Sequence, residues 1–447
     1  MDTPICNFVQ QYAKSDATRL HMPGHKGTAF LGIEPLDITE ISGADSLYDA
    51  AGIIKASEEN ASELFGCRTY YSTEGSSHCI RAMLYLAQLY AKRCGQKPLI
   101  AAARNVHKSF VSAAGMLDLP ILWLYPEKTE TYLHCEIRPE ELDQALENAE
   151  ELPCAVYLTS PDYLGNLADV AGISRICKKH DILLLVDNAH GAYLRFLQPS
   201  LHPMDLGADL CCDSAHKTLP VITGGAYLHI SQSVAPILEP CAKNALSLFG
   251  TTSPSYLILQ SLDGVNPYLQ SYPEKLSELL PRIMDLKMRL TDHGYPFYGA
   301  EPLKLTIAPK SYGYTGEELA QLLEKDGIVC EFADPDYVVL MVTPETTQRD
   351  LQRLEQALLS IPRKSAIQER APEFCKRETC LTIREAMLSV SETIPVCESI
   401  GRILAAVTVG CPPAVPVLVC GERIDQNAID CFRYYGIQTC SVVARIP

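Results

Sequence analysis

Short apolar stretches alternate with amphipathic stretches along much of the chain. Residues 182–186 are fully apolar and residues 155–159 are largely so, which indicates strands buried on both faces of a sheet. Residues 170–180, which lie between them, repeat apolar positions at helical spacing. Buried strands separated by helices predict a parallel sheet of the α/β class, in which ligands bind at the carboxyl ends of the strands.

Periodicity and turn residues predict further elements on either side of this region. Residues 53–65 are expected to form a helix that stops at Gly66, and Gly75-Ser76-Ser77 should begin a second helix that runs to about residue 93. The other expected helices cover residues 139–150, 273–293 and 315–325, and the other expected strands cover residues 99–103, 208–212, 303–307 and 337–342. The expected irregular segments are an N-terminal arm at residues 1–40, a linker at 369–376, and an ordered, proline-containing loop at 410–421 before a last strand.

Composition and charge narrow the classes of function. The chain has 447 residues, which is too long for one core, so two or three domains are expected. Apolar residues make up 47% and charged residues 21%, as is usual for a globular protein. The net charge of −16 argues against a nucleic-acid partner, which would need a basic face. This acidity suits a small cationic substrate, but it could equally serve only solubility.

Cysteines are frequent but show no metal-binding pattern. The 18 cysteines include neither a CxxC pair nor a His/Cys cluster with zinc spacing, so no metal site is expected. Several lie in apolar stretches, which indicates buried, reduced thiols of a cytosolic protein. No signal-peptide pattern occupies the first 20 residues, and no apolar run approaches the ~20 residues of a membrane helix. We therefore expect a soluble cytoplasmic protein with no membrane partner.

Two charged residues follow apolar strands and point to a particular chemistry. Asp187 ends the strand expected at residues 182–186, and Lys217 follows the strand expected at 208–212. Enzymes that use pyridoxal 5′-phosphate (PLP) need this pair, because a lysine forms the Schiff base and a carboxylate holds a proton on the pyridine nitrogen. Burial near another cation would lower the lysine pKa from its free value of ~10.4 and make the amine nucleophilic. Taken singly, each residue could be an ordinary surface lysine or loop carboxylate.

Neighbouring hydroxyls could bind the cofactor's phosphate. Ser76 and Ser77 lie where a helix is expected to begin, and N–H groups and hydroxyls at a helix N-terminus favour a dianion. Serine is also common at this position simply as a helix cap. Ser214 and His216, close to Lys217, could add donors to the same phosphate.

Other residues near the strand ends have an ambiguous chemistry. Ala189 is small enough for a flat ring to lie against the strand end, and His190 could bond the cofactor, bond the substrate, or be a packed loop histidine. His107 follows the apolar run at residues 99–103, where it could stack on the cofactor or lie in a solvated polar loop. Nucleotide-binding patterns are absent: Gly24-His25-Lys26-Gly27 has the wrong spacing for GxxxxGK[ST], and no GxGxxG follows a strand.

Many short motifs occur in an order typical of one enzyme family. They are His21-Met22-Pro23-Gly24-His25-Lys26-Gly27, Asp37-Ile38-Thr39-Glu40, Leu64-Phe65-Gly66, Glu74-Gly75-Ser76-Ser77, Asn105-Val106-His107-Lys108-Ser109, Asp187-Asn188-Ala189-His190-Gly191, Ser214-Ala215-His216-Lys217, Thr252-Ser253-Pro254-Ser255-Tyr256, Gly401-Arg402-Ile403 and Pro412-Pro413. With these motifs the chain resembles the bacterial ornithine/lysine/arginine decarboxylases, from about residue 20 to about residue 430. It resembles the compact class, which lacks the N-terminal receiver-like domain.

The resemblance implies a fold and a domain division. The fold is the PLP-dependent transferase fold type I of aspartate aminotransferase: a large domain with a mostly parallel seven-stranded sheet between helices, and a smaller C-terminal α/β domain. The implied segments are an N-terminal arm at 1–40, a large PLP-binding domain at 41–290, a small α/β domain at 291–365 and a C-terminal decarboxylase-family domain at 366–447.

The resemblance also implies roles for single residues. Lys217 would hold PLP covalently, Asp187 would bind the pyridine nitrogen and His107 would stack on the ring. Thr252 or Ser253 would reach the phosphate of a neighbouring subunit, which makes a homodimer or higher homo-oligomer the expected state. The residues implied to bind the phosphate within the subunit are Ser76, Ser77, Ser214 and His216.

Substrate recognition is the part of the resemblance where this sequence departs from the family. Glu422, in Cys420-Gly421-Glu422, matches a Pro-Gly-Glu element and is implied to contact the substrate's distal cation, although it could also be a solvated loop residue. Cys420 replaces the proline of that element, and Pro412-Pro413-Ala414-Val415-Pro416 stands where the family has Pro-Pro-Gly-Ile-Pro. Both departures concern the expected substrate end of the site.

The expected function is decarboxylation of arginine, lysine or ornithine to an amine that feeds polyamine synthesis. A first alternative keeps the cofactor but breaks another bond, as in an aminotransferase, a lyase or a desulfurase. A second alternative is a non-catalytic relative that binds PLP or a polyamine. The presence of Asp187, Lys217 and His107 together disfavours this second alternative, because a pure binder has no need of an electron sink.

Overall fold

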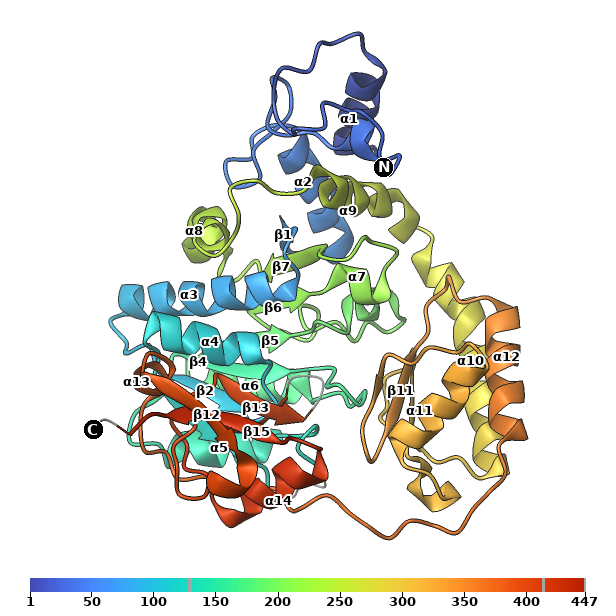
Figure 1. Cartoon of the computed structure of the whole chain (residues 1–447). Coiled ribbons are helices and arrows are strands. Elements are labelled where there is room, and N and C mark those ends of the chain that lie inside the picture. The colour runs from blue at the N-terminus through green and yellow to red at the C-terminus, as the bar shows by residue number, and fades with distance from the viewer. Residues whose placement is uncertain (128–130, 412–414, 446–447) are drawn as a thin grey trace. The chain divides into compact units, whose positions relative to one another are not determined.

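The computed structural model describes residues 1–127, 131–411 and 415–445 (Figure 1). The chain forms two compact units, one from residues 1–97 and 177–276 and the other from residues 98–176 and 277–447. Each unit combines segments that are far apart in the sequence. The division into four segments at 1–40, 41–290, 291–365 and 366–447 stays a prediction.

A mostly parallel sheet is the main feature of the fold. In the described part of the chain its seven strands follow the order β1-β7-β6-β5-β4-β2-β3. Strand β2 is parallel to β3 and β4, β5 is parallel to β6, and β7 runs antiparallel to both β6 and β1. The predicted α/β class with a mostly parallel seven-stranded sheet is therefore confirmed. The strands are β1 (Arg68–Ser72), β2 (Ile100–Ala103), β3 (Ile121–Leu124), β4 (Ala155–Thr159), β5 (Leu183–Asp187), β6 (Leu210–Asp213) and β7 (Ala226–Ile230).

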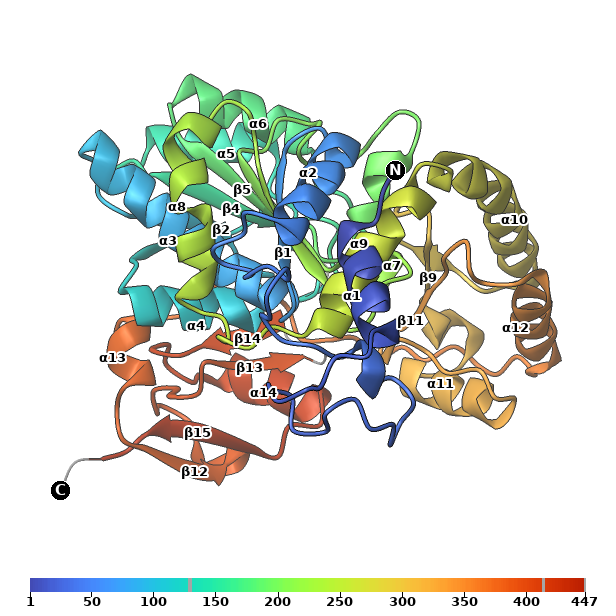
Figure 2. The same ribbon diagram turned by 90° about the horizontal axis from the view of Figure 1, so that it is seen from above.

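The helices of the first unit bury apolar faces against β1, β5, β6 and β7. Helix α2 (Ile53–Phe65) ends at Gly66, whose φ of 71° is left-handed, so the predicted helix and its glycine stop are confirmed. Helix α3 (Ser76–Cys94) packs on β6 and β7, and α8 lies beside it (Figures 1 and 2). The other helices of this unit are α7 (Ala215–Thr218), α8 (Ala235–Ser247), α9 (Tyr256–Leu269) and the 3-10 helices η1 (Glu34–Leu36) and η2 (Ala192–Phe196).

The N-terminal segment contains a helix that its sequence pattern does not reveal. Helix α1 (Pro4–Lys14) buries only Ile5 and Val9, a single apolar pair one turn apart. The backbone N–H of Cys6 donates to the buried Asp263 carboxylate of α9 at 2.9 Å. Because tertiary contacts rather than periodicity stabilise α1, the few periodic patterns of residues 1–40 did not predict this helix, and the N-terminal arm stays a prediction.

The second unit contains a smaller antiparallel sheet besides β2, β3 and β4. Among the described residues its strands follow the order β10-β11-β9-β8, and helices α10 and α12 lie side by side next to them (Figure 2). The strands are β8 (Phe297–Tyr298), β9 (Lys304–Ile307), β10 (Phe332–Ala333) and β11 (Val338–Met341). The helices before the C-terminal part are α4 (Lys108–Leu117), α5 (Pro139–Glu147), α6 (Val170–Lys179), α10 (Tyr272–His293), η3 (Pro309–Tyr312), α11 (Gly316–Lys325) and α12 (Gln348–Ser360).

The C-terminal part of the second unit is built from two antiparallel strand pairs, β12 with β15 and β13 with β14. Residues 415–419 were expected to lie in a loop, but they form the fully buried strand β14, which a register shift at Gly410 accommodates opposite Pro416. Strand β15 follows as the last strand, and residues 412–414, with the Pro412-Pro413 motif, lie outside the described residues. The elements here are α13 (Ile383–Met387), β12 (Ser391–Pro395), η4 (Val396–Glu398), β13 (Thr408–Cys411), β14 (Val415–Val419), α14 (Gln426–Tyr434) and β15 (Thr439–Val443).

The structure bears on the expectations for the cysteines and for membrane helices. The cysteines whose side chains the structure describes are free thiols, and many of them are buried, as the sequence predicts. None of the helices within the described residues is both long and apolar enough to cross a membrane.

Candidate active site

Strand β5 places the Asp187 carboxylate at the carboxyl end of the sheet. All five residues of β5 are buried, and Asp187 is only 2% exposed. Its Oδ1 accepts from the backbone N–H of Ala189 at 3.2 Å, and the Cys212 thiol lies 3.7 Å from the same oxygen. A carboxylate in such a desolvated position is well suited to hold an N–H cation such as a protonated pyridine.

Strand β6 places Lys217 at the same edge of the sheet. Asp187 is in register with Cys212 of the parallel strand β6, and Ser214 is the N-cap residue of the short helix α7, which carries Lys217. The Lys217 amine lies 2.9 Å from Nε2 of His190. The structure therefore brings His190 and Lys217 together, and the imidazole can exchange a proton with the amine.

The first turn of α3 forms a cradle for an anion. Ser214 donates its hydroxyl hydrogen to Oγ of Ser76 at 2.8 Å, and Ser77 follows in the same helical turn, where backbone N–H groups at a helix N-terminus favour an anion. Gly75, with a φ of 72°, turns the chain into the helix and donates to the Gly224 carbonyl at 2.7 Å. The predicted hydroxyls Ser76 and Ser214 thus lie in contact.

His216 contributes to this cradle with one ring nitrogen already engaged. Its Nδ1 donates to the Gly225 carbonyl at 2.9 Å, and its Cε1 is the closest atom to the position of a Cβ on Gly75, at 3.9 Å. Because a carbonyl can only accept, Nδ1 carries a proton. Nε2 would therefore donate to a phosphate only when the ring is an imidazolium.

These groups fit PLP. A covalent anchor requires a primary amine, the pyridine nitrogen requires a carboxylate, and the phosphate requires hydroxyls at a helix N-terminus. Lys217, Asp187, Ser76 and Ser214, which lie on neighbouring elements of one unit, would supply these donors and acceptors.

The roles of all the predicted site residues stay predictions, and three of these residues lie outside the group just described. His107 caps helix α4 of the second unit, where Nδ1 accepts from the Ser109 N–H at 3.2 Å and lies 2.9 Å from the Ser109 hydroxyl. Thr252 and Ser253 are exposed in the loop before α9, close to Thr251, whose N–H donates to the Glu74 carboxylate at 2.6 Å. Ring stacking by His107 and contact with a neighbouring subunit's phosphate are not tested by this geometry.

Glu422 is not a solvated loop residue. It is 2% exposed and lies 3.1 Å from Nη2 of Arg104, which is equally buried at the end of β2. Oε2 also accepts from the Val419 N–H at 2.9 Å, whereas Oε1 has no hydrogen-bond partner among the described residues. The contact with a substrate cation stays a prediction, with Oε1 as the oxygen available for it.

One group of residues near the site was missed from the sequence. Asp213 ends β6 as Asp187 ends β5, and it is completely buried among His202, His229 and Asn188. The available signal was the charged residue at the end of an apolar strand. The two histidines are too distant in sequence to be recognised as its partners.

Comparison with known proteins identifies the family of this chain. Residues 3–306 match the family described as Orn/Lys/Arg decarboxylase, major domain. The uncharacterized protein YaaO of Bacillus subtilis (strain 168) is 31% identical over 461 residues, covering 96% of this chain and 93% of YaaO. An arginine decarboxylase of the same organism is 29% identical and covers 96% of this chain and 92% of its own length.

Solved structures agree on the fold. The Francisella novicida lysine decarboxylase LdcF has a TM-score of 0.82 at 18% identity and covers 99% of this chain and 81% of its own. The Escherichia coli constitutive lysine decarboxylase has a TM-score of 0.79 at 18% identity, covering 99% and 82%. At these identities the structures establish the shared fold alone, whereas the family match covers about two-thirds of the sequence. The chain therefore belongs to the Orn/Lys/Arg decarboxylase family of PLP-dependent amino-acid decarboxylases.

Proposed function

We propose that the enzyme decarboxylates arginine to agmatine and CO2, and that the product is a precursor of polyamines. Four relatives named arginine decarboxylase are 26–29% identical over at least 94% of this chain, which supports arginine over lysine or ornithine. A relative named lysine decarboxylase matches over only 59% of the chain, at 25% identity. The acidic net charge of −16 suits a cationic substrate.

The observation that carries the reaction type is the contact between Lys217 and His190 beside the Asp187 strand end. When bound, PLP supplies an electron sink for the pair of electrons left as the carboxylate departs. Asp187 would keep the ring nitrogen protonated. His190, 2.9 Å from the Lys217 amine, can accept its proton, and the same pair can deliver a proton to the substrate's Cα.

Selection of a basic side chain is proposed to involve Glu422. Its Oε1 is buried without a hydrogen-bond partner among the described residues, and a guanidinium could donate to it. Arg104 already neutralises this carboxylate through Oε2, so the gain from a substrate cation should be smaller than for an isolated carboxylate. The role of Glu422 would then be orientation of the distal group, in addition to attraction.

The test compares arginine with citrulline, its neutral counterpart of nearly equal shape, and with lysine and ornithine. Amine and CO2 are quantified by mass spectrometry under single-turnover and steady-state conditions. Arginine should give agmatine with the highest kcat/KM. Equal kcat/KM for citrulline and arginine would overturn recognition of a cation, and a keto acid in place of CO2 would overturn decarboxylation in favour of an aminotransferase.

We further propose a homodimer in which Thr252 or Ser253 contacts the phosphate of the neighbouring subunit. Their exposure in the loop before α9 supports this proposal, because the hydroxyls are available for such a contact. Light scattering of the active enzyme tests it, and a monomer that retains full activity would contradict it.

A further inference from the structure

Asp213 is a carboxylate without solvent contact directly before the cofactor-binding helix α7. It is 0% exposed, and so are His202 and His229, each of which contacts Oδ2 through Nε2 at 3.0 Å. Asn188 donates its side-chain amide hydrogen to Oδ1 at 2.6 Å. Three segments of the first unit therefore converge on one carboxylate: the turn after β5, the loop after η2, and β7.

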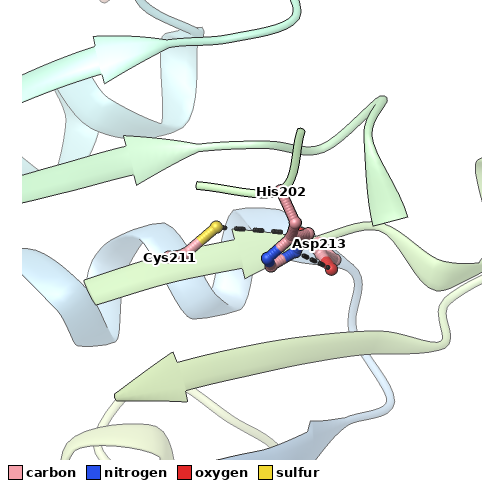
Figure 3. A group of neighbouring side chains, drawn as sticks. All are labelled: His202, Cys211 and Asp213. Carbon is pink, nitrogen blue, oxygen red and sulfur yellow. Dashed lines mark hydrogen bonds and ion pairs between the residues drawn. The ribbon is translucent and has the colours of Figure 1, made fainter. Parts of the chain in front are cut away.

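The geometry favours a hydrogen-bond network over a metal site. Potential ligand atoms of His202, Cys211 and Asp213 lie within 4.8 Å of one another (Figure 3). However, Nδ1 of His202 accepts from the Met204 N–H at 3.3 Å, so the proton of the ring sits on Nε2 and points to Asp213. Burial raises the pKa of the Cys211 thiol well above 9, and this thiol lies 3.8 Å from Oδ1 of Asp213, to which it can donate.

The network stabilises a buried, ionised carboxylate. Burial alone would raise the pKa of Asp213, but the two histidines outweigh it and hold the pKa well below its usual range. Burial likewise opposes a charge on His229, whereas Cys67 and Asp213 raise its pKa above 6.5. The carboxylate is therefore ionised at neutral pH, where the ring N–H groups of the two histidines and the amide of Asn188 stabilise its charge.

The network connects the two strand ends that carry the reactive groups. On one side, Asn188 directly follows Asp187 and donates two hydrogen bonds. Its side-chain amide donates to Asp213, and its backbone N–H donates to the Cys212 carbonyl at 3.0 Å. On the other side, Asp213 is followed by Ser214, the cap of α7 and hydrogen-bond donor to Ser76. A displacement of about 1 Å between groups of this kind can cost about a hundredfold in rate.

We propose that Asp213 is a positioning residue that holds the Asp187 turn and the Lys217 helix at the spacing that PLP requires. The proposal rests on the assignment of the cofactor site and not on the identity of the amino-acid substrate. It requires that loss of the carboxylate disturbs cofactor binding, and not merely folding.

Asp213→Asn keeps the size of the side chain and removes its charge, and Asp263→Asn is the matched control. Asp263 is also 0% exposed in the same unit, where it accepts from Ser57 at 2.6 Å and from the Cys6 N–H at 2.9 Å. Both variants should lose thermal stability. Only Asp213→Asn should weaken binding of PLP to the cofactor-free protein, by about tenfold or more, and move the pH midpoint of the visible absorption band.

PLP affinity is measured by equilibrium dialysis without substrate, so failure of the arginine proposal would not affect the result. His202→Gln is the second variant, and it retains one amide donor. It should also weaken PLP binding and move the band midpoint, but to a smaller extent. This variant tests the proposal even when Asp213→Asn does not fold. PLP affinity and band midpoint equal to the parent in these variants would overturn the proposal. Equally large changes in PLP affinity and band midpoint in Asp263→Asn, at an equal loss of thermal stability, would also overturn the proposal.

Discussion

Glu422→Gln should destabilise the protein by about 3–5 kcal/mol, although glutamate and glutamine have nearly the same shape. The side chains of Arg104 and Glu422 are 1% and 2% exposed, and Nη2 lies 3.1 Å from Oε2. Removing only the carboxylate charge leaves the guanidinium buried without its counter-ion, which costs about 3–5 kcal/mol in proteins. The Arg104 guanidinium also lies 4.8 Å from the ring centroid of Trp123, a contact that survives the change and contributes up to about 2 kcal/mol. We therefore expect a loss near the lower end of the range.

The assay is denaturant unfolding followed by the fluorescence of Trp123, the single tryptophan of the chain and a direct neighbour of Arg104. Glu378→Gln is the matched control, because Glu378 pairs with Arg423 at the surface, where the side chains are 66% and 42% exposed, and its loss should change little. Arg104→Met combined with Glu422→Gln removes both charges and should cost clearly less than the sum of the single changes.

Additive losses in the double variant, or a Glu422→Gln protein as stable as the Glu378→Gln control, would refute this reasoning. Kinetics at a temperature where every variant is folded then separates the two roles of the carboxylate. If Glu422 also binds the substrate cation, kcat/KM for arginine should fall by about ten- to a hundredfold, equivalent to about 1.4–2.7 kcal/mol, and kcat/KM for citrulline should fall less. Equal losses on both substrates would leave Glu422 with a structural role only.

Borohydride should abolish the visible absorption and leave a pyridoxyl group on Lys217 in peptide maps, and a label on another residue would contradict the role of Lys217. Asp187→Ala should retain PLP but lose turnover by orders of magnitude, and near-normal turnover would contradict the role of Asp187. Mixing inactive Lys217→Ala subunits with inactive Thr252/Ser253 double-alanine subunits should restore part of the activity, and no recovery in verified hybrids would contradict a shared site. Burial raises the pKa of Asp334 to about 7 from 3.8, so the folded chain binds more protons between these values and its stability falls as the pH rises from about 4 to about 7. Melting curves of Asp334→Asn against pH should lack this fall, and parallel curves for parent and variant would contradict it.

Elements with strong local signals could be predicted from the sequence. The fully apolar run ending at Asp187 forms β5, and the periodic segment ending at Gly66 forms α2 with the expected left-handed stop. These elements need only information carried by adjacent residues: a continuous apolar run, or apolar positions at helical spacing before a glycine. Helix α1 and strand β14 were not predicted. Helix α1 depends on a contact with the distant Asp263, which adjacent residues do not reveal, and β14 contains Pro416, a residue that disfavours a strand.

The site residues likewise divide into those with a local signal in the sequence and those that only the fold brings together. Lys217, Asp187 and Ser76 follow strands or begin helices in motifs that a sequence can display. The pairing of Arg104 with Glu422 joins residues 318 positions apart, and that of His202 and His229 with Asp213 requires the fold to place a loop and an antiparallel strand beside β6. Spacing along the chain gives no indication of such contacts.

Asp187 and Asp213 illustrate how the structure decides between residues that look alike in sequence. Each is the last residue of a short buried strand, and the strands are parallel neighbours in the sheet. Asp213 already accepts from His202, His229 and Asn188, so its charge is compensated by fixed donors of the protein. Asp187 accepts from the Ala189 N–H and contacts the Cys212 thiol at the end of β5. A protonated pyridine would donate a charge-assisted hydrogen bond to the carboxylate that it meets, whereas Asp213 already accepts from three fixed side-chain donors. We expect Asp187 to hold the pyridine nitrogen of PLP, and we propose that Asp213 positions the two strand ends.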